Sequence, residues 1–95
     1  MMLNIVNKSP FASNSLDSCL STSAPGSSVL LIEDGVYAAL SGRIAETQSD
    51  FTYYALESDL QARGLEGRVP DGVEVIDYSG FVDLVADHDR VQSWL

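Results

Sequence analysis

Short apolar runs alternate along the chain with segments in which apolar residues recur every three or four positions. The runs cover residues 3–6, 29–32, 51–56 and 73–76. They are rich in β-branched and aromatic residues, which favour strands, and the continuous run at 29–32 is typical of a strand buried on both faces. Strands that alternate with helical segments predict βα units and a mainly parallel sheet.

Helical spacing follows each of the four runs. The first expected helix starts at residues 13–15 and ends before 25, and the second covers 36–40 after a tight turn at 33–35. The third starts at 58 or 59 and ends at 64, and the fourth runs from near 79 to 88. Capping side chains begin the first three helices, and glycine or proline ends them. The final residues, 91–95, fit either a short edge strand or a docked coil, and an exposed Trp94 would indicate a subunit contact.

These elements predict a single α/β domain over residues 1–95. Right-handed crossovers would produce a small three-layer, doubly wound, mainly parallel sheet of four to five strands with helices on both faces. Such sheets place functional loops beyond the carboxyl ends of their strands. Three loops meet that condition, at residues 7–13, 33–35 and 57–59.

Composition is typical of a soluble globular protein. The chain has 95 residues, of which 45% are hydrophobic and 20% charged, and no apolar run approaches the ~20 residues needed to span a bilayer. The first eight residues lack the basic and long apolar regions of a secretory signal. An unpaired cysteine suits a reducing compartment, so we expect a cytoplasmic protein without membrane contact.

The charge balance limits the class of partner. Acidic residues number 14 against 5 basic ones, which gives a formal charge of -9. Phosphate neutralisation by lysine and arginine supplies most of the affinity of ordinary nucleic-acid binders, so we expect no direct nucleic-acid binding. The acidity serves either solubility or attraction to a basic protein partner.

No motif for a cofactor or a metal stands out, and we expect neither. The glycines are too scattered for a phosphate-binding loop, and one histidine and one cysteine far apart have no metal-ligand spacing. His88 lies near a helix end, which favours a structural or solvent role over that of a general base. Glu33 and Asp34 are adjacent and diverge on an extended chain, so we expect a helix cap rather than a catalytic acid pair.

Cys19 is the one cysteine of the chain, so it cannot form an internal disulfide. A thiolate at this position would accept sulfur as a persulfide and pass it on by thiol exchange. However, Leu16, Cys19 and Leu20 share one helix face, and that pattern favours burial of the thiol as a small hydrophobe. Asp17 opposes ionisation and the dipole of the helix helps little one turn in from the cap, so activation is weak.

Several segments together resemble the TusB/DsrH family. They are Asn-Lys-Ser-Pro-Phe at residues 7–11, the stretch at 29–40 around Leu-Ile-Glu-Asp-Gly-Val-Tyr-Ala-Ala, Asp-Leu-Gln-Ala-Arg-Gly at 59–64, Ile-Asp-Tyr-Ser-Gly-Phe-Val at 76–82, and Val-Gln-Ser-Trp at 91–94. The likeness runs nearly end to end and keeps order and spacing.

The resemblance implies a subunit of a cytoplasmic sulfur-relay complex. Its partners would be TusC/DsrF-like and TusD/DsrE-like chains in a heterohexamer, with sulfur arriving from a TusA-like carrier. The principal sulfur-accepting cysteine of the family belongs to the TusD/DsrE-type subunit. Cys19 matches a cysteine that only some TusB/DsrH members have, which implies an auxiliary persulfide carrier at most.

Three functions follow as hypotheses. The leading one is an accessory subunit of the relay that makes 2-thiouridine at the tRNA wobble position, and the second is a DsrH subunit of dissimilatory sulfur oxidation. The third is a stand-alone doubly wound binding module without sulfur chemistry. By residue type, the candidates for subunit contacts are Phe11, Tyr37, Tyr53, Tyr54 and Trp94.

Overall fold

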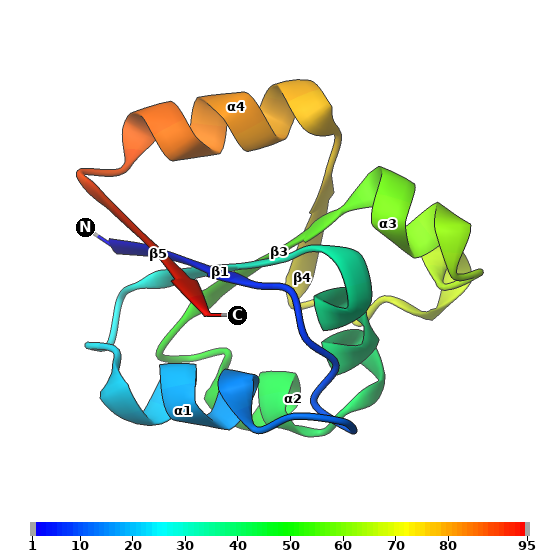
Figure 1. Ribbon diagram of the computed structural model, residues 1–95, viewed down its shortest axis with the longest axis horizontal. Helices are drawn as coiled ribbons and strands as arrows, with labels where there is room; N and C mark the ends of the chain where they lie inside the picture. The colour runs from blue at the N-terminus through cyan, green and yellow to red at the C-terminus, as the bar shows by residue number, and fades with distance from the viewer. Residues whose placement is uncertain (1, 95) are drawn as a thin grey trace.

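Five parallel strands form the sheet around which the chain is organised (Figure 1). The structure is a computed structural model and describes residues 2–94. The strands are β1 (Met2–Val6), β2 (Ser28–Leu31), β3 (Thr52–Leu56), β4 (Val73–Ile76) and β5 (Arg90–Trp94). The predicted α/β class with a parallel sheet is therefore confirmed, and the C-terminal segment is an edge strand.

The sheet order is β4-β3-β2-β1-β5. From β1 the chain steps outward to β4, and it then returns across the sheet to place β5 on the other side of β1. Leu3 of β1 is in register with Ser28 of β2 and with Val91 of β5. The direction of winding thus reverses at β1, which makes the sheet doubly wound as expected.

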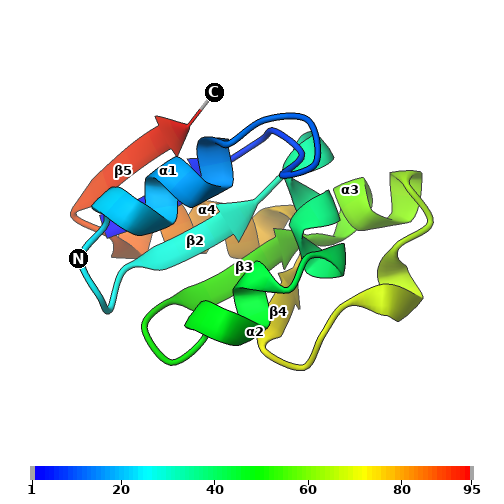
Figure 2. The same cartoon turned by 90° about the horizontal axis from the view of Figure 1, so that it is seen from below.

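Helical elements cover both faces of the sheet. They are α1 (Ser15–Thr22), the 3₁₀ segment η1 (Glu33–Leu40), α2 (Arg43–Thr47), α3 (Glu57–Ala62), the 3₁₀ turn η2 (Glu66–Arg68) and α4 (Tyr78–Asp87). In Figure 1, α1 and α2 lie on one side of the sheet and α4 lies alone on the other. Figure 2 views the same arrangement from the side of α1 and α2.

The main hydrophobic core lies between the sheet and α1. Val6, Val29 and Leu31 pack there against residues of α1 and η1. Because side chains alternate along a strand, Leu3 and Leu30 face the opposite side, toward α4, and both are fully buried. No residue of α4 itself is buried, so this helix is the least embedded of the longer elements.

The region between β2 and β3 differs from the sequence prediction. The expected turn at 33–35 and helix at 36–40 form one 3₁₀ segment, which brings Gly35 against β1 so closely that an added Cβ would lie 2.1 Å from the carbonyl oxygen of Val6. The 3₁₀ segment ends at Leu40 as expected, because Ser41 is extended, and a further short helix that the sequence pattern does not predict, α2, starts at Arg43 after Gly42. Ile44 anchors α2 in the core, and Arg43 pairs with Asp17 of α1 at 2.8 Å.

Two predicted side-chain caps are absent, whereas the last helix has one that the sequence pattern does not predict. Helix α1 begins at Ser15 without a side-chain cap hydrogen bond, although the sequence predicts a cap at residues 13–15. Helix α3 begins at Glu57 without a side-chain cap, so neither Ser58 nor Asp59 caps it. Helix α4 begins at Tyr78, and the Asp77 carboxylate accepts a hydrogen bond from the backbone N–H of Gly80 at 2.8 Å. Within residues 2–94, no helix has the length and apolar character required to cross a membrane.

Candidate functional site

Cys19 lies on the face of α1 that packs against the sheet. Its side chain is fully buried, together with Leu16 and Leu20 from the same face of the helix. The thiol is part of the main core cluster, which also includes Tyr53 of β3. The burial favoured by the i, i+3, i+4 spacing is therefore confirmed.

The surroundings of Cys19 disfavour its thiolate. Burial raises the pKa of the thiol above its ordinary value of 9.0, and a hydrogen bond with Ser23 opposes this shift with a smaller effect. The Cys19 Sγ and Ser23 Oγ atoms are 3.8 Å apart. Arg43, which contacts α1 through Asp17, is held by the carboxylates of Asp17 and Glu46. In this conformation the group is a protonated core thiol rather than a nucleophile.

A hollow at the amino ends of the strands comes close to this thiol. Its volume is about 580 Å³, and it is lined by Met2, residues 22–27, Asp89 and Arg90. Ser23 both lines the hollow and contacts Cys19, so the Ser23 side chain lies between the thiol and the hollow. Sequence reasoning directs attention to the carboxyl ends of the strands and misses this hollow. The turn signal Pro25-Gly26, where Gly26 has φ 95°, marks its position.

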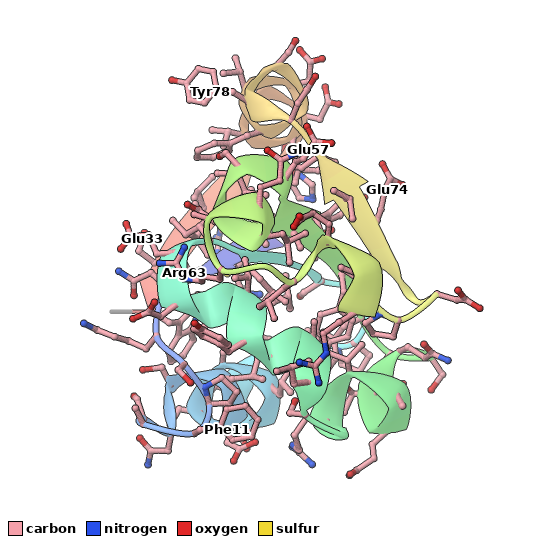
Figure 3. The ribbon with its side chains drawn as sticks, turned by 90° about the vertical axis from the view of Figure 1, so that its right-hand side faces the viewer. Phe11, Glu33, Glu57, Arg63, Glu74 and Tyr78 are labelled. Carbon is pink, nitrogen blue, oxygen red and sulfur yellow. The ribbon has the colours of Figure 1, made fainter. Side chains whose placement is uncertain are left out.

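At the carboxyl ends of the strands, an ion-pair cluster joins two of the three predicted loops. The Arg63 guanidinium lies 2.9 Å from the Asp34 carboxylate and donates to the backbone oxygen of Asp59 at 3.1 Å. The backbone N–H of Glu33 donates to the Asp59 carboxylate at 2.7 Å. Figure 3 shows Glu33 and Arg63 on the same side of the molecule.

This cluster changes the interpretation of the acidic pair. Neither Glu33 nor Asp34 caps η1 with its side chain, so the predicted capping role is wrong. Asp34 instead binds Arg63, a residue to which sequence reasoning assigns no role. The spacing of Asp59 and Arg63, i and i+4 on a helix, predicts only their own contact, which is 3.8 Å, and would have drawn attention to Arg63. The cluster ties η1 to α3 through the carboxylates of Asp34 and Asp59.

The third predicted loop starts beside the same edge. Its first residue, Asn7, has its Cα next to Gly35, and its side-chain oxygen is buried without a hydrogen-bond partner among the described residues. Across residues 2–94, no group of three or more histidine, cysteine or acidic side chains is placed to hold a metal ion.

His88 connects the end of α4 to the sheet. Its Nδ1 lies 2.8 Å from the Leu84 carbonyl oxygen, which only accepts, so this nitrogen carries the proton. In the neutral ring its Nε2, 3.0 Å from Ser28 Oγ, then accepts from the serine hydroxyl. Because Ser28 is buried at the start of β2, the pair fastens α4 and serves the structural role expected of His88.

The aromatic residues divide into core and surface groups. Tyr53 is buried, and Tyr37 and Trp94 pack against the core while partly exposed. Of the candidates named by residue type, Phe11 is the one that is mostly exposed, at 68%. Tyr78 is more exposed, at 72%, although sequence reasoning does not single it out.

Comparison with known proteins identifies the family. The model of the family described as DsrH like protein matches residues 8–91. The chain belongs to the DsrH-like family. Curated relatives of this DsrH-like chain are called Protein TusB: one from Photorhabdus laumondii is 38% identical, and one from Serratia proteamaculans is 36% identical. Each alignment covers 98% of this chain and 100% of the relative.

Solved structures of other proteins have the same architecture as this chain. The ychN protein from Escherichia coli superposes on the DsrH-like chain with a TM-score of 0.76 at 20% identity, covering 97% of each chain. Protein Tm0979 from Thermotoga maritima has a TM-score of 0.68 at 27% identity, covering 94% of this chain and 95% of its own. The likeness to ychN concerns the fold alone.

Proposed function

We propose that this chain is an accessory subunit of a cytoplasmic sulfur-relay complex. Its membership of the TusB/DsrH family supports a sulfur-relay subunit, and its predicted partners are TusC/DsrF-like and TusD/DsrE-like chains in a heterohexamer. In that assembly a TusA-like carrier delivers the sulfur, and the principal acceptor cysteine lies on the TusD/DsrE-like chain.

The burial of Cys19 is the observation that carries the accessory role. A primary sulfur acceptor needs a thiolate that a donor can reach, whereas this thiol is fully buried and its pKa is raised by that burial. The chain offers no other cysteine. The first reaction with the sulfur donor therefore belongs on a partner subunit.

An auxiliary carrier role for Cys19 is the second part of the proposal. The Cys19 thiolate would attack the terminal sulfur of a persulfide on a donor cysteine, which forms the Cys19 persulfide and releases the donor as a thiolate. This exchange conserves atoms and electrons. It requires the last turn of α1 to open at Ser23, where the thiol lies behind the hollow.

Persulfide mapping tests both parts. The purified complex, containing this chain with its TusC- and TusD-like partners, is exposed to a loaded TusA-like carrier, and persulfides are located by alkylation and mass spectrometry. We expect the earliest persulfide on the TusD-like chain and slower, partial labelling of Cys19. Labelling of Cys19 before the partner contradicts the accessory role, and no labelling of Cys19 over the full course of transfer removes the carrier role.

A Cys19→Ser variant separates structure from chemistry. If the chain acts only as a scaffold, the variant assembles and supports relay at the wild-type rate. If Cys19 carries sulfur, assembly is unchanged while transfer slows. Native mass spectrometry measures assembly, and the rate at which sulfur leaves the TusA-like carrier measures transfer.

For the destination of the sulfur, we propose 2-thiouridine formation at the tRNA wobble position. The curated relatives called Protein TusB support this branch over the sulfur-oxidation branch. Deletion of the gene is expected to deplete 2-thiouridine in bulk tRNA, measured by nucleoside mass spectrometry, and plasmid-borne wild type to restore it. Unchanged 2-thiouridine together with impaired sulfur oxidation would support the DsrH alternative.

Mixing this chain with the purified partner chains tests whether it is a relay subunit at all. A stand-alone binding module would remain a monomer when mixed with the TusC- and TusD-like chains. Size-exclusion chromatography with light scattering distinguishes that outcome from a stable assembly. Failure to associate with either chain contradicts the relay function.

A further inference from the structure

The residue that follows α1 connects the buried thiol to open space. Ser23 comes directly after Thr22, the last residue of the helix, and has extended backbone with φ -80° and ψ 145°. Its hydroxyl lies 3.8 Å from Cys19 Sγ, and its side chain also lines the hollow of about 580 Å³ beside the turn that joins α1 to β2 (Figure 2). Its backbone N–H donates to the Cys19 carbonyl oxygen at 2.9 Å, which fixes the two residues relative to each other.

The contact between Ser23 and Cys19 has one direction when the thiol ionises. A thiolate has no proton to give, so the Ser23 hydroxyl must then donate to the Cys19 sulfur. Hydrogen bonds to an ionised group are stronger than those between neutral groups. Burial has the larger effect and raises the pKa of Cys19, whereas the Ser23 contact lowers it. Ser23 thus favours the form of the thiol that reacts.

The other hydroxyl groups of the hollow donate elsewhere. Thr22 and Ser27 line it as well, and each donates to a backbone carbonyl oxygen. Within the described lining, Ser23 is therefore the residue whose hydroxyl meets the thiol.

Tyr53 of β3 is the titratable side chain of the sheet that interacts with Cys19. Burial and, with a smaller effect, the charge of an ionised Cys19 raise the pKa of Tyr53. The Thr47 hydroxyl donates to the backbone oxygen of Arg43, so Tyr53 is the donor in the hydrogen bond that joins Tyr53 to Thr47. The proton of Tyr53 is already committed and does not serve a Cys19 thiolate.

Charged groups near α1 and the hollow complete these surroundings. Asp17 of α1 and Arg43 of α2 pair with each other at 2.8 Å. Asp89 and Arg90, at the turn into β5, line the hollow. The shift in the pKa of Cys19 arises from burial first and from Ser23 second.

The hollow is the approach to Cys19 that disturbs the core least. Leu16 and Leu20, on the same face of α1, are at most 7% exposed and hold the helix against the sheet. Ser23 is half-buried, and Pro25 and Gly26 beyond it are exposed. This end of α1 can therefore move without exposing the two leucines.

We propose that Ser23 is a positioning residue for sulfur exchange at Cys19, where its hydroxyl keeps the sulfur beside the hollow and donates to the thiolate. This inference rests on the proposed carrier role. The occupant of the hollow during transfer is the persulfide end of a donor cysteine. The Cys19 sulfur attacks the terminal sulfur of that persulfide, the S–S bond breaks, and the donor leaves as a thiolate. The proton of Ser23 stays on the serine throughout.

A matched pair of substitutions tests the hydroxyl. Ser23→Thr keeps it, whereas Ser23→Val has nearly the same shape as threonine and no hydroxyl. Both β-branched residues suit the extended backbone at this position, so both variants should fold, which thermal unfolding checks. Ser21→Thr and Ser21→Val form the control pair, because Ser21 does not line the hollow and its hydroxyl donates to the Asp17 backbone oxygen at 2.7 Å.

The first readout is the ionisation of Cys19 in the isolated chain. We expect the pKa of Cys19 to be higher in Ser23→Val than in Ser23→Thr, measured from the ¹³C chemical shift of the Cys19 β-carbon between pH 7 and 11. At about pH 8, alkylation of Cys19 by iodoacetamide should be about tenfold slower in Ser23→Val than in Ser23→Thr, and the Ser21 pair should agree within about twofold. Equal titrations and equal rates in the Ser23 pair overturn the role of Ser23, even where the two variants differ in stability.

The second readout is sulfur transfer in the assembled complex, which separates this inference from the proposed function. With a loaded TusA-like carrier, the Cys19 persulfide should form about tenfold more slowly in Ser23→Val than in Ser23→Thr, while labelling of the TusD-like chain is unchanged. Equal formation of the Cys19 persulfide in the Ser23 pair overturns the assistance by Ser23 while the carrier role stands. No Cys19 persulfide in the wild type overturns the carrier role and, with it, the role of Ser23 in transfer.

Discussion

At the scale of single residues, burial decides what the titratable groups of the core do. Cys19 and Tyr53 both lie in the main cluster, and burial raises the pKa of each. The opposing hydrogen bonds, from Ser23 and Thr47 respectively, have smaller effects. Both groups therefore keep their protons in the folded chain at pH values where the unfolded chain has begun to lose them.

This difference predicts a loss of stability in alkali. Because the folded pKa is raised, the contribution of Cys19 is fully present below about its ordinary value of 9.0 and is lost as the pH rises toward the folded value. The free energy of unfolding, from urea titrations between pH 7 and 11, should fall with a steepening slope above pH ~9. In Cys19→Ala the slope should be smaller, although the variant starts about 1 kcal/mol less stable at pH 7. Identical slopes in the two proteins would show that ionisation of Cys19 does not cause the loss of stability.

The spacing of single residues also explains which features of the candidate site could be predicted from the sequence. Burial of Cys19 follows from two leucines on the same helix face, a local pattern that sequence contains. Contacts between distant residues are different: nothing along the chain announces that Arg63 binds Asp34, or that Trp94 donates to Asn4 at 3.0 Å. Such pairs depend on how the loops and strands meet, so they become visible only in the folded structure.

At the scale of elements, β5 is held to the sheet by one buried polar network. Asn4 is fully buried, accepts from the Trp94 indole and donates to the backbone oxygen of Ser28 at 3.3 Å. An edge strand would otherwise depend on its ladder with β1 and on a few partly exposed side chains. This network fixes a segment for which the sequence pattern leaves strand and coil both open.

Removing the indole donor should therefore lower the stability of the fold. Trp94→Phe leaves the Asn4 side-chain oxygen buried without a partner, and we expect the free energy of unfolding to fall by about 1–3 kcal/mol. Chemical denaturation measures the loss. The double variant Asn4→Leu and Trp94→Phe removes both polar groups, so it should be more stable than the sum of the single effects predicts. Strictly additive losses would show that the hydrogen bond contributes nothing.

Helix α4 should open more readily than the rest of the fold. It buries no residue, and His88 is its polar attachment to β2 through Ser28. His88→Ala is expected to accelerate amide exchange in α4 at least about tenfold while β1, β2 and β3 change little. Hydrogen exchange with mass spectrometry resolves these segments. Asp87→Ala, at an exposed neighbouring position, is the matched control and should leave the exchange of α4 within about twofold.

The elements that sequence predicts poorly share a physical cause. The segment at Glu33–Leu40 is a 3₁₀ helix in which Gly35 lies within contact distance of β1, and no local propensity reports that contact. Helix α2 is short and is held by the burial of Ile44 and by ion pairs of Arg43. Tertiary contacts thus stabilise a helix that the sequence pattern does not predict. The strands, in contrast, have patterns strong enough to be located within about one residue.

At the scale of the whole molecule, the alternation of strands and helices determines the parallel sheet, and the handedness of crossovers limits its topology. The strand order and the exposure of apolar side chains on α4 are less accessible from sequence. Val82 and Val85 look like ordinary apolar positions of an amphipathic helix until the structure shows which side of α4 meets the sheet. An apolar stripe and a core stripe have the same spacing, so sequence alone does not separate them.

The net charge of -9 should make the isolated chain more stable as salt is added. Screening weakens repulsion among the acidic groups, and this gain exceeds the loss at the surface ion pairs, each of which contributes little. We expect the thermal midpoint, measured by circular dichroism, to rise by about 2–5 °C between 20 and 500 mM NaCl. The charge-reduced variant Asp83→Asn and Asp87→Asn should have a higher midpoint at low salt and a smaller rise. A midpoint that falls with NaCl would show that the ion pairs of Arg43 and Arg63 outweigh the overall repulsion.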